Sequence, residues 1–355
     1  MTKFKVAVIG VGSISKYHIQ GYLASPDVEL YAFCDINEGR LKEKGETYGI
    51  TRLYTDEAKM LAELPEIDLV SVCTWNCAHA ACSIMALNAG KHVLCEKPMA
   101  MNVEEALAMK EAAERNNKLL MIGFVRRFGR DCRVVTDLIE HDRLGDIYYA
   151  KAQYLRSNGN PGGWFGNTAL SGGGPLIDLG VHSIDLVRYL MGKKKVVSVY
   201  GATFEKLGNR PHIKTGKAYR SSSTESGDVC DCEDLATAMI RFEDGSVLNV
   251  EVSFSLNIGG EETNVVQLFG TKAGVSMTKE IRMFSELDGY LTNTEVGKGM
   301  GFDFEPSFTA EIAHFIACAK GETECRNTAE DGVEMMKILC AIYRSAKSGH
   351  EETLA

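Results

Sequence analysis

The chain has 355 residues, of which 45% are hydrophobic and 25% charged, and its formal net charge is −9. This length fits two domains, and this composition is typical of a globular protein with a sizeable core. The acidic balance excludes a general binder of nucleic acid or anionic membranes, and no run of 18 apolar residues indicates a membrane span.

The eleven cysteines are an odd number, are scattered, and in several places lie inside apolar runs. They predict reduced thiols in a cytoplasmic protein, not a disulfide framework. The N-terminus passes directly into an apolar strand without a cleavable signal pattern. Cys230 and Cys232 form a C-x-C motif, but no second half follows at zinc-finger spacing, so we expect no bound metal.

The first apolar run, Phe4 to Gly10, is typical of a parallel strand that is buried on both faces. It leads into a G-x-G-x-x-S turn, in which Gly10 makes the tight turn and Gly12 lets the backbone approach a pyrophosphate. Ser15 stands where a third glycine is usual. A helix and a second strand follow, and the strand ends at Asp35. This order predicts dinucleotide binding.

The acid after the second strand indicates which dinucleotide binds. Asp35 would accept hydrogen bonds from the adenosine ribose hydroxyls, and its charge would repel a 2′-phosphate. No arginine stands at positions 36 and 37, and Arg40 is the nearest. The sequence therefore favours NAD over NADP.

Alternation of strands and helices continues through the first half of the chain. Helical patterns cover 56–64, 78–88 and 102–116, and apolar strands cover 67–74, 92–96 and 119–124. Such alternation predicts a doubly wound parallel sheet, which binds ligands at the carboxyl ends of its strands. The polar residues at such ends are Thr74, Asn76, Glu96 and Lys97.

Lys97 stands between an acid and a proline at one of these ends. A lysine at a strand end is usually a solvated surface residue. Here it would lie at the edge of the sheet where the cofactor is expected. A cis bond between Lys97 and Pro98 would aim the amine toward that edge.

A glycine-rich stretch, GGGPLIDLGVH, opens a predicted helix over 176–191. Pro175 suits the first helical position, and Gly192 suits the end. Asp178 and His182 are four residues apart and therefore share one face of this helix. Spacing alone leaves two interpretations, a proton-transfer site or an ordinary surface pair.

The second half of the chain predicts a large open sheet closed by two helices. Strand patterns cover 147–156, 196–204, 235–242, 246–256, 263–269 and 274–277, and the helices cover 307–320 and 328–348. Such a sheet needs both faces covered, so we expect a homodimer or homotetramer formed through its outer face.

Three features of this half allow two interpretations each. Trp164 and Phe165 lie in a glycine-rich loop and either cover a nicotinamide or sugar or anchor the loop in the core. The basic segment 207–228 is an exposed or subunit-contacting loop, or it meets an anionic substrate. Arg127 belongs to a basic cluster that is either a solvated helix face or part of the active site.

Four motifs occur in order: VAVIGVGSIS, CTWNCAHAACSIMALNAGKHVLCEKP, GFVRRF and GGGPLIDLGVHSIDLVRYLMG. With them the whole chain resembles the glucose–fructose oxidoreductase and inositol dehydrogenase family (Gfo/Idh/MocA). The resemblance implies an α/β protein with an N-terminal Rossmann domain, which we place at 1–123. It further implies a C-terminal substrate-binding and oligomerisation domain, at 124–355, with a large, mostly antiparallel open sheet.

The resemblance also implies the site residues. The catalytic positions are Lys97, Asp178 and His182. The cofactor-binding positions that it implies are Gly10, Gly12, Asp35, Thr74, Asn76, His79, Glu96 and Lys97. To these we add Ser13 and Ile14 in the glycine turn and Trp164 in the glycine-rich loop. The resemblance places Arg127 near the substrate, and the other expected substrate-binding residues are Asp178, His182 and Asn158, which follows the strand 147–156. The sequence departs from the family pattern at Ser15, and at Trp75, where a proline is usual.

The implied reaction is hydride transfer between a nicotinamide and a secondary hydroxyl of a sugar, cyclitol or related small molecule. His182 would act as general base, Lys97 would stabilise the charge on the oxygen, and Asp178 would orient the substrate. One alternative is an enzyme that cleaves glycosides through transient oxidation by a retained NAD. Another is a sensor that binds NAD and sugar without turnover.

Overall fold

The computed structural model describes residues 3–354 apart from 211, 215–219, 222 and 224–227. The chain forms two compact units, Met1–Val125 with Glu305–Met336, and Arg126–Phe304 with Lys337–Ala355. The segment Glu305–Met336, which lies inside the domain that we expected at 124–355, thus packs with the first unit. The reason is a long-range contact, because Ile122 donates its N–H to the carbonyl of Asn327 at 3.0 Å.

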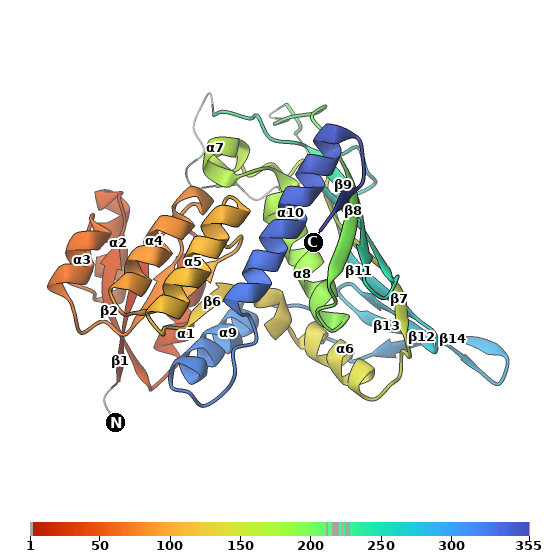
Figure 1. The fold of residues 1–355 in the computed structure, drawn as a ribbon, viewed down its shortest axis with the longest axis horizontal. Helices are drawn as coiled ribbons and strands as arrows, with labels where there is room; N and C mark the ends of the chain where they lie inside the picture. Colours follow the sequence, from red (N-terminus) through yellow and green to blue (C-terminus); the bar gives the residue numbers. More distant parts are fainter. Residues whose placement is uncertain (1–2, 211, 215–219, 222, 224–227, 355) are drawn as a thin grey trace. The chain divides into compact units, whose positions relative to one another are not determined.

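The first unit contains the expected doubly wound parallel sheet (Figure 1). Its strands are β1 (Phe4–Ile9), β2 (Val28–Cys34), β3 (Leu53–Tyr54), β4 (Leu69–Val72), β5 (His92–Glu96) and β6 (Leu120–Gly123). They are ordered β3-β2-β1-β4-β5-β6, so the chain reverses direction across the sheet between β1 and β4. In this architecture ligands bind beyond the carboxyl ends of the strands at such a point.

Helices alternate with these strands: α1 (Ser15–Leu23), α2 (Glu38–Tyr48), α3 (Glu57–Glu63), α4 (Asn76–Asn88) and α5 (Val103–Arg115). Helix α5 begins as the sequence predicts, because the side chain of Asn102 accepts the N–H of Glu105 at 2.8 Å. We did not predict α2. Its two glycines, Gly39 and Gly45, weaken the helical pattern, yet Asn37 caps it.

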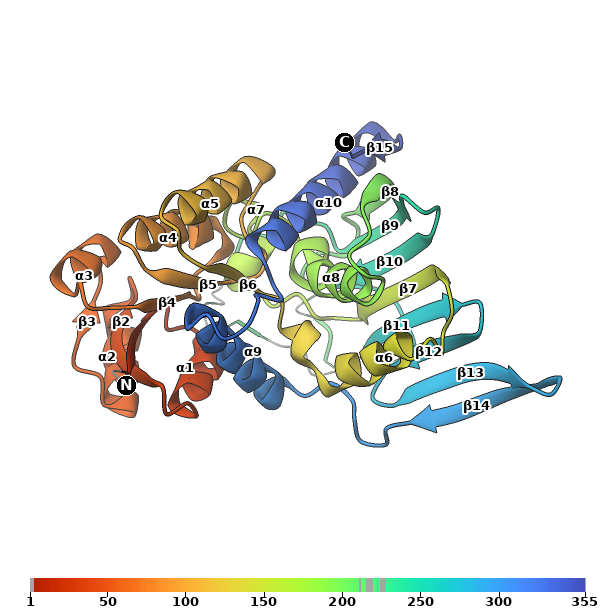
Figure 2. The same ribbon diagram turned by 60° about the horizontal axis from the view of Figure 1, so that its bottom comes forward.

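The second unit is built on the expected large, mostly antiparallel sheet. Its strands are β7 (Ile147–Arg156), β8 (Val196–Phe204), β9 (Leu235–Phe242), β10 (Val247–Ser253), β11 (Glu262–Gly270), β12 (Ala273–Met277), β13 (Ile281–Leu287), β14 (Tyr290–Val296) and β15 (Glu352–Thr353). Figure 2 shows them side by side in the order β14-β13-β12-β11-β7-β10-β9-β8-β15. Only the β7–β10 pair among these described strands is parallel.

The register of this sheet separates an apolar face from a mixed face. On one face Ala150 pairs with Leu248 and Leu268, and all three side chains are fully buried. On the other face Met239 pairs with Asn249 and Tyr200, and Met239 and Tyr200 are about half exposed. Successive residues of a strand point to opposite faces, so the core lies on the first face.

The helices of this part of the chain are η1 (Val125–Phe128), α6 (Arg130–Glu140), η2 (Gly163–Gly166), α7 (Thr168–Ser171), η3 (Leu176–Gly180) and α8 (Val181–Leu190). Of these, η3 and α8 pack on the sheet. Helix α8 packs on β7, β10 and β11, and α6 lies beside α8 (Figure 2).

The last two helices are α9 (Phe304–Ala319) and α10 (Ala329–Ser348). Helix α10 contributes to both units, because the division of the chain falls between Met336 and Lys337. Its N-terminus has a capping pattern, in which Thr328 and Asp331 exchange side-chain to backbone hydrogen bonds. No helix of the described residues is both long enough and apolar enough to span a membrane.

The prediction of one continuous α-helix over 176–191 is wrong at its start. The chain first makes a π-helical turn, η3, in which Val181 donates its N–H to the carbonyl of Leu176, and then continues as α8. A π-helical turn is wider than an α-helical one, and such turns are frequent at functional sites. Asp178 therefore lies in η3, and His182 lies in the first turn of α8.

Candidate active site

The glycine turn after β1 has the form that a dinucleotide requires. Gly10 has φ +83°, and a side chain there would lie 2.6 Å from the carbonyl oxygen of Cys73. Around Gly12, in contrast, a Cβ would meet no atom within 4 Å. The backbone of Gly12 thus borders open space at the start of α1, which is the cradle that a pyrophosphate occupies. Ser15, the departure from the usual glycine, is buried and donates its hydroxyl to the carbonyl of Gly12 at 2.7 Å.

Asp35 lies beside this turn at the end of β2 and is 6% exposed. Its carboxylate accepts the N–H of Val11 and the N–H of Asn37, each at 2.8 Å. Arg40 reaches the same carboxylate at 3.5 Å. Asp35 therefore has a fixed orientation next to the glycine turn, and lone pairs remain for a further donor such as a ribose hydroxyl. These residues fit a bound NAD.

His79 lies in α4 and is almost fully buried. Its Nδ1 is 2.7 Å from the carbonyl oxygen of Pro98, and its Nε2 is 3.2 Å from that of Thr74. Burial lowers the pKa of His79, although these carbonyls and the charge of Glu96 oppose the effect. The ring joins the end of β4 to the Lys97–Pro98 segment, whose peptide bond is cis.

Glu96, the last residue of β5, is also buried. It accepts a hydrogen bond from His18 at 2.7 Å and the N–H of Lys97 at 3.2 Å. Burial raises the pKa of Glu96, but the hydrogen bond from His18 and the nearby charges of His18 and Lys97 outweigh it and hold that pKa below its usual value. Glu96 thereby fixes the backbone from which the half-buried side chain of Lys97 extends.

The η3–α8 segment shows how Asp178 and His182 differ from their neighbours. From Gly173 to Arg188, a stretch that the structure describes completely, every residue is buried except these two. An ordinary surface pair lies on an exposed helix face with other polar residues around it. Asp178 and His182 instead are the two positions at which a buried segment reaches solvent.

Arg127 and Asp185 form a buried ion pair, and Asp185 lies three residues after His182 in α8. Two nitrogens of the guanidinium lie 2.9 Å and 2.6 Å from the carboxylate oxygens of Asp185, and Arg127 is 1% exposed. The Arg127 guanidinium also lies over the ring of Tyr189, 5.1 Å from its centroid. Arg127, which we expected near the substrate, thus binds η1 to α8.

A polar cluster lies at the end of β7. The guanidinium of Arg156 contacts Glu262 at 3.1 Å and the Tyr154 hydroxyl at 3.0 Å. Burial lowers the pKa of Arg156, but Tyr154, Asp178 and Glu262 outweigh it and raise that pKa above its usual value. Arg156 is therefore within electrostatic reach of Asp178. Two residues further, Oδ1 of Asn158 is buried and has no hydrogen-bond partner among the described atoms.

The aromatic loop residues stack on each other. The ring centroids of Trp164 and Phe165 are 4.0 Å apart, and both side chains are half-buried. The pair thus has the features of a loop anchor and still leaves part of each ring accessible. The basic segment 207–228 lies in part outside the described residues; within the described part, Arg210 and Arg220 bind backbone carbonyls of Ser157 and Asn160.

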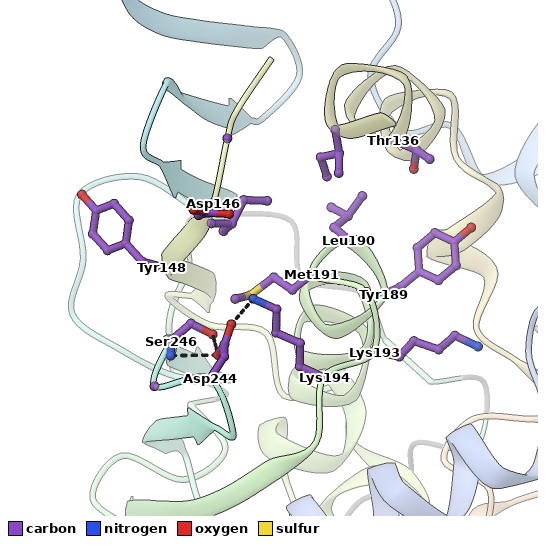
Figure 3. Close-up of a pocket in the computed structure, with 15 residues that line it drawn as sticks. Thr136, Asp146, Tyr148, Tyr189, Leu190, Met191, Lys193, Lys194, Asp244 and Ser246 are labelled. Atoms are coloured by element: carbon purple, nitrogen blue, oxygen red, sulfur yellow. Dashed lines mark hydrogen bonds and ion pairs between the residues drawn. The ribbon is translucent and has the colours of Figure 1, made fainter. Parts of the chain in front are cut away.

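A pocket of about 900 Å³ lies elsewhere in the second unit, between the ends of α6 and α8 and the β9–β10 turn (Figure 3). One of its two described acids, Asp244, is bound to Lys194 and Ser246, and these contacts, that of Lys194 first, lower the pKa of Asp244 to about 2. None of the site residues that we expected lies in its described lining. Among the described residues, no three acidic, histidine or cysteine side chains gather as a metal site.

Several residues around the site carry no local sequence signal. His18 meets Glu96 across 78 positions, Asp185 meets Arg127 across 58, and Glu233 meets Leu176 across 57. These contacts depend on the fold, so no motif could reveal them. Arg156 is different, because it is the last residue of β7, a strand that the sequence predicts over 147–156.

Comparison with known proteins identifies the family. Residues 4–124 match an oxidoreductase family with an NAD-binding Rossmann fold, and residues 136–354 match the C-terminal α/β domain of the same family. The chain belongs to the Gfo/Idh/MocA oxidoreductase family. The expected family, fold class and cofactor are therefore confirmed.

Two curated relatives of this Gfo/Idh/MocA protein cover nearly its whole length. D-glucoside 3-dehydrogenase of Escherichia coli (strain K12) is 34% identical over 348 residues, which are 97% of this chain and 96% of the relative. Myo-inositol 2-dehydrogenase of Thermotoga maritima is 26% identical over 358 residues, which cover 98% of this chain and 96% of the relative. Both relatives are dehydrogenases, one named for a glucoside and one for an inositol.

A solved structure of levoglucosan dehydrogenase in complex with NADH has the same fold. It superposes with a TM-score of 0.86 over all of both chains, at 24% sequence identity. The structural match therefore covers both units of this chain.

Proposed function

We propose that the protein is an NAD-dependent dehydrogenase that oxidises a secondary hydroxyl of a sugar, cyclitol or sugar derivative. One observation carries the proposal: in the fully described stretch from Gly173 to Arg188, only Asp178 and His182 are not buried. A carboxylate and an imidazole that reach solvent from a buried segment are suited to proton transfer with a ligand. The names of the two curated relatives support the substrate class.

In the proposed reaction a hydroxyl proton leaves the substrate oxygen while hydride leaves the adjacent carbon. His182 accepts the proton as general base. Lys97 donates a hydrogen bond to the same oxygen and stabilises its developing negative charge. Asp178 accepts a hydrogen bond from a substrate hydroxyl and orients it. NAD, when bound, supplies the hydride acceptor.

We further propose which residues hold the cofactor. The backbone at Gly12, Ser13 and Ile14 binds the pyrophosphate at the start of α1, and Asp35 binds the ribose hydroxyls. The fixed negative charge of Asp35 disfavours the 2′-phosphate of NADP, although Arg40 lies beside it. The remaining cofactor positions in the proposal are Thr74, Asn76, His79, Glu96, Lys97 and Trp164.

For the substrate we propose a neutral polyhydroxylated molecule. Arg156 offers donors that Glu262 and Tyr154 hold in place, and Asn158 offers a buried acceptor without a partner among the described atoms. A donor at the end of β7 and an acceptor two residues beyond it suit adjacent hydroxyl groups. The positive charge of Arg156 is already balanced by Glu262, which disfavours a sugar acid. Arg127, which we expected among the substrate-binding residues, is buried in its pair with Asp185, so in this proposal it supports α8 and does not contact the substrate.

The test is an NAD-reduction assay over glycosides, aldoses, cyclitols and sugar acids, repeated with NADP. With the substrate that reacts, Lys97→Ala and His182→Ala are expected to lower kcat at least about a hundredfold, the scale of positioned acid–base groups. NAD affinity should change little. Matched controls are Lys59→Ala and His141→Ala, since Lys59 is exposed on α3 and His141 is exposed at the C-terminal end of α6.

Near-normal kcat in both Lys97→Ala and His182→Ala, with NAD still bound, would contradict the assignment. The same assay separates the alternatives. A glycoside-cleaving enzyme would release free sugar without net NADH, whereas a sensor would bind NAD and sugar with no product.

We also propose that copies of the chain associate through the mixed face of the nine-stranded sheet, as a dimer or tetramer. Large side chains on this face include Tyr149, Tyr200, Met239, Phe269 and Phe284. Exposed aromatic and apolar groups in one area indicate a protein contact. All eleven cysteines lie within the described residues and are free thiols, which supports the proposed cytoplasmic location.

A further inference from the structure

The η3–α8 segment begins against a buried carboxylate, that of Glu233. Glu233 directly precedes the β9 region and is 5% exposed. It accepts the N–H of Gly174 at 2.9 Å, the N–H of Leu176 at 3.2 Å and the hydroxyl of Tyr343 at 2.8 Å. A buried carboxylate is costly unless its oxygens are hydrogen-bonded, so these three donors make the contact specific.

The glycines before η3 are shaped to this carboxylate. A Cβ on Gly174 would lie 2.5 Å from the backbone oxygen of Glu233 and 2.9 Å from its carboxyl carbon. A Cβ on Gly173 would overlap the hydroxyl of Tyr343. Within the second unit these glycines let the backbone approach Glu233 and Tyr343.

The contact lies at the end of the segment where position matters most. The first N–H groups of a helix have no partner inside the helix, and a carboxylate there satisfies them and favours the positive end of the helix dipole. Leu176 is the first residue of η3, Asp178 follows two positions later, and His182 lies one turn further. Movement of the backbone at Leu176 is therefore transmitted to both side chains.

Burial raises the pKa of Glu233, and hydrogen bonds from Tyr343, Gly174 and Leu176 oppose that rise. All three groups donate to the carboxylate. The ionised form of Glu233 is thus the one that this geometry suits.

We propose that Glu233, held by Tyr343, is a positioning residue for turnover: it sets the start of the η3–α8 segment so that Asp178 and His182 meet the substrate. The inference rests on the proposed function. Glu233 touches neither substrate nor cofactor in this scheme and acts through the backbone of Gly174 and Leu176.

The neighbouring acid provides a matched control. Asp234 is as buried as Glu233 and also accepts backbone N–H groups, those of Lys206, Leu207 and Gly208. These residues follow β8 and lie outside the η3–α8 segment. Loss of either carboxylate removes hydrogen bonds of a similar kind, but only Glu233 orders the residues before Asp178.

The experiment compares Glu233→Gln, Tyr343→Phe and Asp234→Asn in the full-length protein with NAD. The substrate is the panel compound with the highest kcat/KM, used with hydrogen and with deuterium on the reacting carbon. Measured are kcat per folded molecule, KM, the isotope effect on kcat, the NAD Kd and the melting temperature. Glu233→Gln places an amide N–H₂ where a carboxylate oxygen met N–H donors, which displaces the backbone.

For Glu233→Gln we expect kcat per folded molecule to fall about tenfold to a hundredfold, since a misplacement of about 1 Å has effects of this size. The isotope effect should rise because hydride transfer becomes slower than the other steps. Tyr343→Phe should show a smaller change in the same direction. The NAD Kd should stay within about twofold, and Asp234→Asn should keep the wild-type kcat per folded molecule and isotope effect.

The inference is overturned if Glu233→Gln keeps the wild-type kcat per folded molecule and isotope effect, or if Asp234→Asn loses as much as Glu233→Gln. If Glu233→Gln does not fold, Tyr343→Phe decides by the same two readouts. Asp178→Asn and His182→Ala separate the two proposals. If Asp178→Asn and His182→Ala retain turnover, the proposed function is refuted. If these two variants lose turnover while Glu233→Gln keeps the wild-type kcat, the positioning role alone is refuted.

Discussion

At the scale of single residues, Gly10 and Gly12 contribute to one turn in different ways. Gly10 has a positive φ, and the backbone of Cys73 and Thr74 lies against it. Gly12 has neither constraint, and open space lies where its side chain would be. The first glycine is needed for the fold of the turn, and the second leaves room for a ligand.

This difference predicts opposite behaviour of two alanine variants. Gly10→Ala should destabilise the fold by several kcal/mol, because a Cβ there meets backbone atoms that cannot move away easily. Gly12→Ala should keep the wild-type melting temperature within a few degrees but weaken NAD binding at least about tenfold. Thermal unfolding and NAD titration measure the two effects. Equal loss of stability in both variants would show that Gly12 is structural.

Glu57 is a residue for which the structure predicts a pH effect. Burial, with a smaller contribution from Asp56, raises the pKa of Glu57 to about 7, although a hydrogen bond with Cys82 opposes the rise. Oε1 of Glu57 is buried without a partner among the described atoms. Since the folded state holds its proton to higher pH than the unfolded state, this group's contribution to stability is full below about pH 4.5 and declines as the pH rises toward 7.

Glu57→Gln removes that titration. The free energy of unfolding of the wild type, relative to the variant, should fall by about 2 to 3 kcal/mol between pH 4.5 and pH 8. Urea unfolding at several pH values measures the difference. Glu63→Gln, which changes an exposed acid at the end of the same helix, is the control: it retains Glu57, so the wild type relative to this variant should show no such change with pH. If Glu57→Gln keeps the pH dependence of the wild type, Glu57 is not its source.

At the scale of elements, helix starts with local caps were predictable. Asn102 for α5 and Thr328 for α10 cap within three residues, so the sequence contains the whole interaction. The start of the η3–α8 segment is different, because its cap is Glu233, far away in the sequence. The strands β13 and β14 were missed because polar residues interrupt their alternation, although Asp288 and Gly289 between them form a hairpin signal.

The Arg127–Asp185 pair predicts how η1 and α8 are held together. Arg127→Met should lower the free energy of unfolding by about 3 to 5 kcal/mol, because it leaves the carboxylate of Asp185 buried without its cation. Arg127→Met combined with Asp185→Leu should recover much of that loss. Urea unfolding of the two single variants and the double variant forms the cycle. Additive losses would mean that the pair contributes no coupling.

At the scale of the whole molecule, the two faces of the nine-stranded sheet have separate roles. The apolar face forms the core of the second unit with α8. The mixed face combines charged positions such as Lys151 with the half-exposed side chains of Tyr200 and Met239. A broad sheet surface of this kind is typical of an interface between copies.

Charge on that face should dissociate the proposed oligomer. Met239→Lys combined with Phe284→Lys places two cations on the mixed face and should shift the protein toward the monomer in analytical ultracentrifugation. Leu107→Lys, at an exposed position of α5 in the first unit, is the control and should leave the mass unchanged. A monomeric wild type, or an oligomer that withstands the double change, would contradict the proposed interface.

The sequence by itself determined most of the elements in their order, although α2, β13 and β14 were missed. It also determined the glycine turn, the parallel sheet of the first unit, the class of cofactor and the family. These features depend on spacing over a few residues, on apolar runs and on turn chemistry, all of which are local. It also drew attention to Asp178 and His182, but their spacing alone favoured an ordinary surface pair.

Only the tertiary structure decided how these two side chains are set. It buries the segment around them, begins that segment with a π-helical turn, and brings Glu233 and Tyr343 to its start. It also assigns Arg127 to Asp185 and His79 to two backbone carbonyls. The physical reason is common to all of them: a buried polar group needs a partner, and the partner is supplied by the fold from residues far away in the chain.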